Sequence, residues 1–176
     1  RRRLAGLTNK MTSGGPTSLQ KALTWYYGED GPVYFKNASA GYYKGMDDIR
    51  SALPGIFEEV LRIPGLIFQI NTLGGAISSG VEGAYPHRAL PYLGEAQAYW
   101  ETASHAARLR EAIDRIRSHI AQAGVTSHYA NYPDLAFADW PTAYYGAENY
   151  ARLQHLKQRY DPENRIRHPQ SVRLPG

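Results

Sequence analysis

Tyrosines are concentrated near the end of the sequence, in a stretch that also holds two Asn-Tyr pairs. Between residues 128 and 165 lie Tyr129, Tyr132, Tyr144, Tyr145, Tyr150 and Tyr160. A phenol can stack on a flat organic molecule, donate a hydrogen bond, or accept a proton when nearby cations or donors stabilise its anion. The chain has 14 Tyr but only 4 Phe, although Phe would fill a core equally well, which indicates hydroxyl groups in use. The alternative is a half-hydrated interface, where Tyr offers an apolar body and a polar tip.

The surrounding pattern predicts the elements that would position these phenols. We expect helices over residues 17–28, 45–65, 104–124 and 146–160, with Thr17 or Ser18 capping the first and Pro54 bending or interrupting the second. We expect strands over residues 31–37, 66–75, 92–100 and 125–132. The order of these elements predicts an α+β fold, in which an antiparallel or mixed sheet carries helices on one face. The other face of the sheet must then meet something else.

The helix at 104–124 is the clearest of these elements. Leu109, Ile113, Ile116 and Ile120 recur at helical spacing and form one apolar face, while Arg and Glu cover the other. The strand expected at 125–132 matters most for chemistry, because in extended chain Tyr129 and Asn131 would share one face and Tyr132 the other.

Composition places the chain among globular proteins and excludes several kinds of site. Hydrophobic residues make up 43% and charged residues 20%, whereas a disordered chain would be less apolar and more charged. Without cysteine there is no disulfide, no thiolate metal site and no cysteinyl link to a cofactor, and the 6 His lack ligand spacing, so we expect no metal. No apolar run is long enough to span a bilayer. We therefore expect a soluble protein with no membrane contact, whose compartment stays open.

The basic balance of the chain raises the question of a nucleic-acid partner. The net charge is +4, and much of the excess lies in the opening stretch "RRRLAGLTNK". A short basic arm can bind nucleic acid. No basic stripe with interleaved aromatic residues follows it, so we expect a solvated end and no nucleic acid.

Several stretches together resemble one protein family. "YANYPD" at 129–134, Trp140, "YYGAENYARLQHLKQRYDPENR" at 144–165 and "QSV" at 170–172 are similar to the C-terminal region of berberine-bridge-enzyme-like oxidases. These are FAD-linked oxidoreductases of the vanillyl-alcohol-oxidase superfamily. Residues 71–100 resemble the family's Gly-Gly strand, its Pro-His-Arg and the strand that follows, and residues 34–60 resemble the start of its substrate domain. Ile166-Arg167 departs from the pattern, at a position that concerns packing.

The resemblance implies a function for most of the chain. Residues 31–176 would form a substrate domain, preceded by a basic segment and helix at 1–30. The assembly would oxidise an alcohol, amine or sugar-like hydroxyl by proton abstraction and hydride transfer to flavin N5. Nothing here resembles the family's pyrophosphate-binding loop, so FAD would be bound mainly by a partner, either a separate FAD-binding chain or the N-terminal half of the same precursor, cleaved near the leading arginines. The alternative is a non-catalytic α+β binding module that keeps the fold.

The resemblance also implies the residues of the site. We predict Tyr132 as the base and Glu95 as the second candidate, because a carboxylate is unusual on a strand of Ala, Leu and Tyr. We predict substrate contacts from Tyr129, Leu93, Gln97 and Tyr92, and cofactor contacts from Asn131, Asn149 and Tyr150. The alternatives are structural: a Tyr bonded to a backbone carbonyl, Glu95 as a charge that protects an edge strand, and Asn149 as a helix cap.

Overall fold

The computed structural model describes residues 15–27, 34–80 and 83–176, and its contacts divide the chain into two compact units between Pro32 and Val33. The basic arm lies outside the described residues. In the first unit, helix α1 spans Leu19–Tyr27. Ser18 Oγ accepts the Lys21 N–H at 3.2 Å, which confirms the expected helix and identifies Ser18 as its cap.

The second unit is built on a three-stranded antiparallel sheet. Its strands are β1 (Tyr34–Tyr43), β2 (Leu66–Thr72) and β3 (Tyr92–Trp100), in the order β1-β3-β2. The central strand β3 pairs Glu95 with Ser39 of β1 and with Gln69 of β2. The predicted α+β class with an antiparallel sheet is confirmed.

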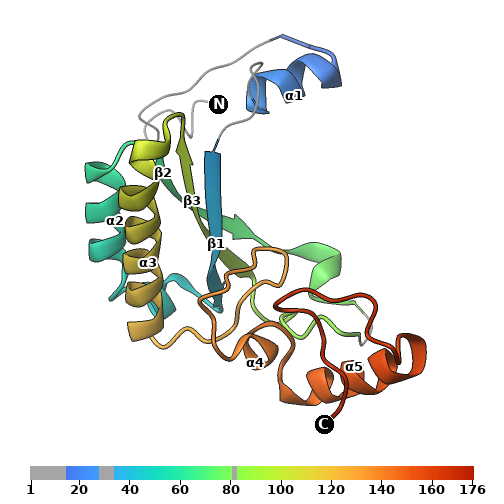
Figure 1. Ribbon diagram of the computed structural model, residues 1–176. Coiled ribbons are helices and arrows are strands. Elements are labelled where there is room, and N and C mark those ends of the chain that lie inside the picture. The colour runs from blue at the N-terminus through green and yellow to red at the C-terminus, as the bar shows by residue number, and fades with distance from the viewer. Residues whose placement is uncertain (1–14, 28–33, 81–82) are drawn as a thin grey trace. The chain divides into compact units, whose positions relative to one another are not determined.

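Two helices cover one face of this sheet. Helices α2 (Leu53–Arg62) and α3 (Ala106–Gln122) lie side by side against it (Figure 1). The four apolar residues predicted for α3 are all buried in the core, together with Ala96, Ala98 and Trp100 from β3. Short 3₁₀ turns occupy Met46–Ile49, Gly75–Ile77 and Ala103–His105. Within the described residues, no helix is long and apolar enough to cross a membrane.

The helix expected over 45–65 is divided. The 3₁₀ turn Met46–Ile49 comes first, and α2 begins at Leu53 with Pro54 in its first turn. Pro has no N–H to donate, so the first turn of a helix accommodates it without loss. The predicted interruption therefore lies just before Pro54.

The strand expected over 125–132 is wrong. Residues 125–139 form no regular element, and helices α4 (Trp140–Tyr145) and α5 (Ala147–Tyr160) follow them. Residues 125–133, the edge loop, still lie along the free edge of β1, where Tyr42 N–H donates to Ser127 O at 2.9 Å and Ser39 N–H to Tyr132 O at 3.3 Å. Between these contacts a turn closes with Tyr132 N–H bonded to Tyr129 O at 3.0 Å, which breaks the alternation of a strand.

A β-bulge between Ser39 and Gly41 changes which side chains of β1 face the helices. Ala38, Ala40 and Tyr43 belong to the hydrophobic core, whereas Tyr42, paired with Leu93, lies on the other face of the sheet. Gly41 has φ +93, and a Cβ there would lie 2.1 Å from Val125 Cγ1. The bulge thus needs glycine, because the edge loop packs directly against its main chain.

Candidate active site

The face of the sheet away from α2 and α3, the open face, carries mostly polar side chains. Since paired residues of antiparallel strands point to the same side, the open face has three rows across it. They are Asn37–Gln97–Ile67, Ser39–Glu95–Gln69 and Tyr42–Leu93–Asn71. The rows present a carboxylate and four carboxamides on one surface.

Glu95 lies at the centre of this arrangement. It is 4% exposed, and Asn37 Nδ2 donates to its Oε1 at 3.3 Å, which orients the carboxylate. Gln97 lies on the same face and accepts a hydrogen bond from the Tyr99 hydroxyl at 3.2 Å. Tyr92, a predicted substrate contact, packs instead against the hydrophobic core on the helix side, because it occupies an alternate position of the strand.

Four tyrosines line a cavity of about 550 Å³ beside the open face, here called the phenol cavity. Its lining is Tyr42, Asn71, Thr72, Leu73, Ile77, Tyr85, Arg88, Leu93, Tyr129 and Tyr132. The predicted residues Tyr132, Tyr129 and Leu93 thus meet at one place. The expectation that Tyr129 and Tyr132 point to opposite faces is wrong: their rings contact edge to face, with centroids 5.1 Å apart, because the turn brings them together.

Tyr42 is a cavity residue that the sequence did not reveal. It is buried between His87, whose ring stacks on it at 4.3 Å, and Tyr85, whose hydroxyl donates to the Tyr42 hydroxyl at 3.3 Å. Burial, followed by this hydrogen bond, raises the pKa of Tyr42, so it remains a neutral phenol. Arg88 brings a cation to the lining, with its guanidinium 5.4 Å from the Tyr85 ring and Nη1 bonded to Ile77 O at 3.0 Å.

Two buried histidines lie outside the lining of the phenol cavity, and the ring of His87 packs against it. His87 Nε2 lies 3.0 Å from Tyr144 O, and the His128 ring packs on Phe137 with centroids 4.1 Å apart. Burial lowers the pKa of His87 and lowers that of His128 to about 4. Both rings are therefore neutral near pH 7.

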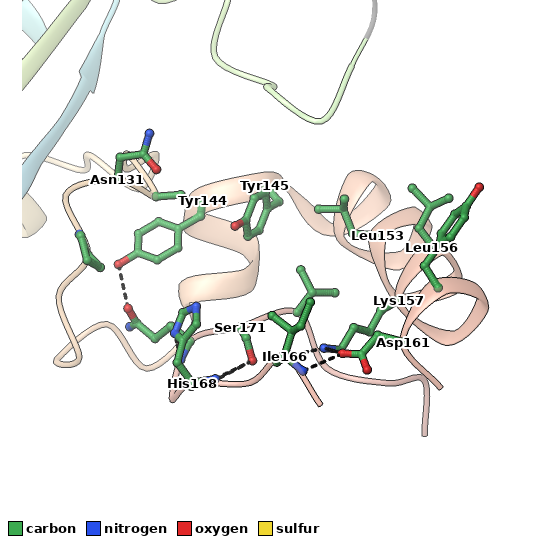
Figure 2. A pocket seen from close by; sticks show the side chains of 15 residues that line it. Asn131, Tyr144, Tyr145, Leu153, Leu156, Lys157, Asp161, Ile166, His168 and Ser171 are labelled. Atoms are coloured by element: carbon green, nitrogen blue, oxygen red, sulfur yellow. Dashed lines mark hydrogen bonds and ion pairs between the residues drawn. The ribbon is translucent and has the colours of Figure 1, made fainter. Parts of the chain in front are cut away.

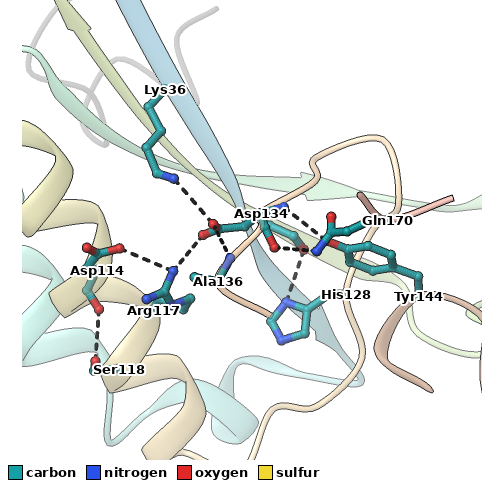
Figure 3. A network of polar contacts seen from close by, with 10 residues as sticks. Lys36, Asp114, Arg117, Ser118, His128, Asp134, Ala136, Tyr144 and Gln170 are labelled. Carbon is teal, nitrogen blue, oxygen red and sulfur yellow. Dashed lines mark hydrogen bonds and ion pairs between the residues drawn. The ribbon is translucent and has the colours of Figure 1, made fainter. Parts of the chain in front are cut away.

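A buried carboxylate, Asp134, anchors the end of the edge loop (Figure 3). Its oxygens meet Lys36 Nζ at 3.4 Å, Arg117 Nη1 at 2.8 Å and the Ala136 N–H at 3.1 Å. Burial alone would raise the pKa of Asp134, but the Ala136 N–H and the charges of Lys36 and Arg117 together lower it. Asp134 is therefore a charged tie between β1, α3 and the edge loop.

Tyr144 and Gln170 bind the main chain of Asp134. Its N–H donates to the Tyr144 hydroxyl at 3.0 Å, and its carbonyl accepts from Gln170 Nε2 at 2.8 Å. The Tyr144 hydroxyl donates in turn to Gln170 Oε1 at 3.3 Å. Burial raises the pKa of Tyr144. Asp134, Tyr144 and Gln170 thus have a structural role, which the sequence alone did not separate from a chemical one.

The predicted cofactor contacts lie apart from one another. Asn131 is exposed, donates from Nδ2 to the Tyr129 hydroxyl at 2.8 Å, and lines a second cavity of about 500 Å³ with Tyr145 and the C-terminal tail (Figure 2). Asn149 and Tyr150 lie on α5 and line neither cavity. The Tyr150 ring packs edge to face on Trp140 at 5.4 Å. Of these three, Asn131 is the one in contact with the cavity tyrosines.

Known proteins share both the sequence motif and the fold. Residues 128–173 match the family described as "Berberine and berberine like". The FAD-linked oxidoreductase YvdP of Bacillus subtilis is 34% identical over 128 residues, which cover 72% of this chain and 28% of YvdP. Chitooligosaccharide oxidase of Gibberella zeae is 41% identical over 66 residues, 37% of this chain and 13% of that oxidase.

The fold of berberine bridge enzyme from Eschscholzia californica matches with a TM-score of 0.71 at 20% identity, over 88% of this chain and 36% of that one. The chain thus spans well under half the length of each of these relatives. The matching motif, the relatives and the shared fold agree with one another. In sequence and in fold the chain therefore resembles part of the berberine-bridge-enzyme-like FAD-linked oxidoreductases, and residues 128–173 carry the motif of that family.

Proposed function

We propose that this chain is the substrate-domain part of an FAD-dependent oxidase acting on an alcohol, amine or sugar-like hydroxyl. One observation carries the proposal: the phenol cavity adjoins the polar open face through Leu93, two residues from Glu95 on the same side of β3. A flat or ring-shaped substrate in this cavity would have aromatic walls and a carboxylate close by. A relative named chitooligosaccharide oxidase supports a sugar-like substrate.

The residues of the open face fit a planar cofactor. Asn37, Gln69, Asn71 and Gln97 offer flat donors and acceptors on a sheet surface, which suits the polar edge of a flavin ring. When bound, FAD supplies the hydride acceptor. We propose that FAD is bound mainly by polypeptide beyond these 176 residues, in a heterodimer or as another part of one precursor. Asn131 would then contribute a contact from this chain.

The chain's own groups would bind the substrate, orient it and take its proton. Glu95, oriented by Asn37, and Tyr132, in the cavity wall, are the two candidate bases. Tyr129 and Tyr42 would stack on the substrate and exclude water, because both rings line the cavity with their faces crossed at 78°. A neutral Tyr42 would act as a hydrogen-bonding wall.

The test is flavin reduction in the assembly that contains this chain and FAD. Tyr132→Phe and Glu95→Gln each remove one proton-accepting group with little change of shape. The variant that lacks the true base should reduce flavin roughly 10²–10⁴-fold more slowly than the parent, measured anaerobically in a single turnover. Tyr160→Phe is the matched control, because this ring is 72% exposed on α5. If both site variants reduced flavin at the parental rate, neither residue would be the base. An assembly without flavin absorbance would indicate the non-catalytic module instead.

A further inference from the structure

The hydroxyl of Ser39 contacts three polar groups. Ser39 is 1% exposed, and its Oγ accepts the Tyr129 N–H at 3.0 Å and the Gly41 N–H at 3.3 Å. A serine oxygen has two acceptor positions and one proton. His128 Nδ1 lies 3.3 Å from the same oxygen, in a contact whose direction depends on the tautomer of the ring.

Ser39 also touches both ends of the turn that bears the cavity tyrosines. Its side chain holds the start of the turn through the Tyr129 N–H, and its main-chain N–H donates to Tyr132 O at the end, at 3.3 Å. Across the sheet, Ser39 is paired directly with Glu95. Ser39, at the β-bulge, thus connects the edge loop that carries Tyr132 to the strand that carries Glu95.

We propose that Ser39 is a positioning residue of this site: its hydroxyl fixes the Tyr129–Tyr132 turn relative to Glu95. The proposal rests on the proposed function. Ser39 does not contact the phenol cavity's contents, since its oxygen is enclosed by main chain and His128. It acts through Tyr129 and Tyr132, whose distance from a substrate held over Glu95 depends on where the turn lies.

Removing the hydroxyl leaves buried donors without a partner. In Ser39→Ala the Tyr129 and Gly41 N–H groups lose their acceptor, and the turn must shift to find water or another oxygen. A displacement of about 1 Å at a reacting group can lower a rate about 10²-fold. We therefore expect Ser39→Ala to reduce flavin roughly 10–100-fold more slowly at saturating substrate, in the folded, flavin-containing assembly.

The experiment compares Ser39→Ala with Ser39→Thr, which keeps a hydroxyl, and with Ser118→Ala as control. Ser118 Oγ makes a single hydrogen bond to Asp114 O at 2.9 Å on the exposed side of α3. Three quantities are measured in each: the rate of flavin reduction, the melting temperature, and the hydrogen-exchange protection of the Tyr129 amide. Should Ser39→Ala not fold, Ser39→Cys replaces it, because a thiol is a much weaker acceptor.

The rate is expected to follow the protection of the Tyr129 amide across the variants, with Ser118→Ala at the parental values. A lower melting temperature with a parental rate at saturating substrate would make Ser39 merely structural and overturn the proposal. So would Ser39→Thr restoring amide protection without restoring the rate. A parental assembly that fails to reduce its flavin contradicts the proposed function, whereas unchanged Tyr129 protection in Ser39→Ala contradicts positioning by Ser39, so the two failures are distinct.

Discussion

Neutralising Asp134 should destabilise the protein far more than neutralising Asp114, although both bind the same guanidinium. Arg117 Nη1 lies 2.8 Å from Asp134 and 3.2 Å from Asp114, but the Asp134 side chain is 3% exposed and that of Asp114 53%. Removing one partner of a buried ion pair costs about 3–5 kcal/mol. Arg117 and Lys36 are 22% and 28% exposed, so water would partly solvate them. We expect a loss of about 2–3 kcal/mol for Asp134→Asn and of about 0–1 kcal/mol for Asp114→Asn.

The measurement is urea unfolding of the full chain in both variants, with the midpoint compared at equal slope. The pH dependence gives a second check. Because the folded pKa of Asp134 is lowered from its ordinary 3.8, its stabilisation is complete above that value and disappears as pH falls through the folded pKa. The gap between the parent and Asp134→Asn should therefore shrink as the solution is made more acidic than pH 3.8. Equal losses in the two variants, or a gap that widened in acid, would refute the reasoning.

Two further changes test the buried groups around the edge loop. Because burial lowers the pKa of His128 from 6.5 to about 4, the unfolded chain binds a proton that the folded one refuses, and stability should fall by about 3 kcal/mol from pH 6.5 to pH 4. In His128→Gln the urea midpoint should change less between pH 4 and pH 6.5 than in the parent. In the exposed control His155→Gln it should change as much as in the parent. A parental change of the midpoint with pH in His128→Gln would contradict this. Gly41→Ala should cost about 3 kcal/mol, since its Cβ would lie 2.1 Å from Val125 Cγ1 at φ +93. Gly45→Ala, with open space around its Cβ, should leave the melting temperature nearly unchanged, and similar values for both glycines would argue against the steric account.

The helices and strands that a local pattern of apolar residues determines could be predicted from the sequence. Helix α3 follows from Leu109, Ile113, Ile116 and Ile120, because a single apolar stripe at helical spacing has one way to be buried. Strand β3 was also expected at its observed bounds, which put Glu95 and Gln97 on one face. Local patterns of apolar residues thus predict the sheet and the helices that cover it.

The edge loop could not be predicted, because distant residues determine its path. Residues 125–132 resemble a strand in composition, yet the hydroxyl of Ser39 binds the Tyr129 N–H and a turn closes between Tyr129 and Tyr132. Tyr42 was missed for the same reason: the bulge that directs it to the cavity depends on contact with the loop. Helix α4, with 6 residues, is too short for a period to show.

Many of the hydrogen bonds that hold the edge loop and the adjoining Asp134 go to main-chain groups. His128 N–H bonds to Ala143 O, Ser39 holds the N–H of Tyr129 and the carbonyl of Tyr132, and Tyr144 with Gln170 holds the peptide groups of Asp134. None of these bonds depends on the side chains at 130, 131 and 133. Positions 130 and 131 are therefore free to vary while the backbone path persists, so a library confined to them would diversify the rim of the site and leave its frame unchanged. Pro133 is left out because its ring fixes the backbone at that position.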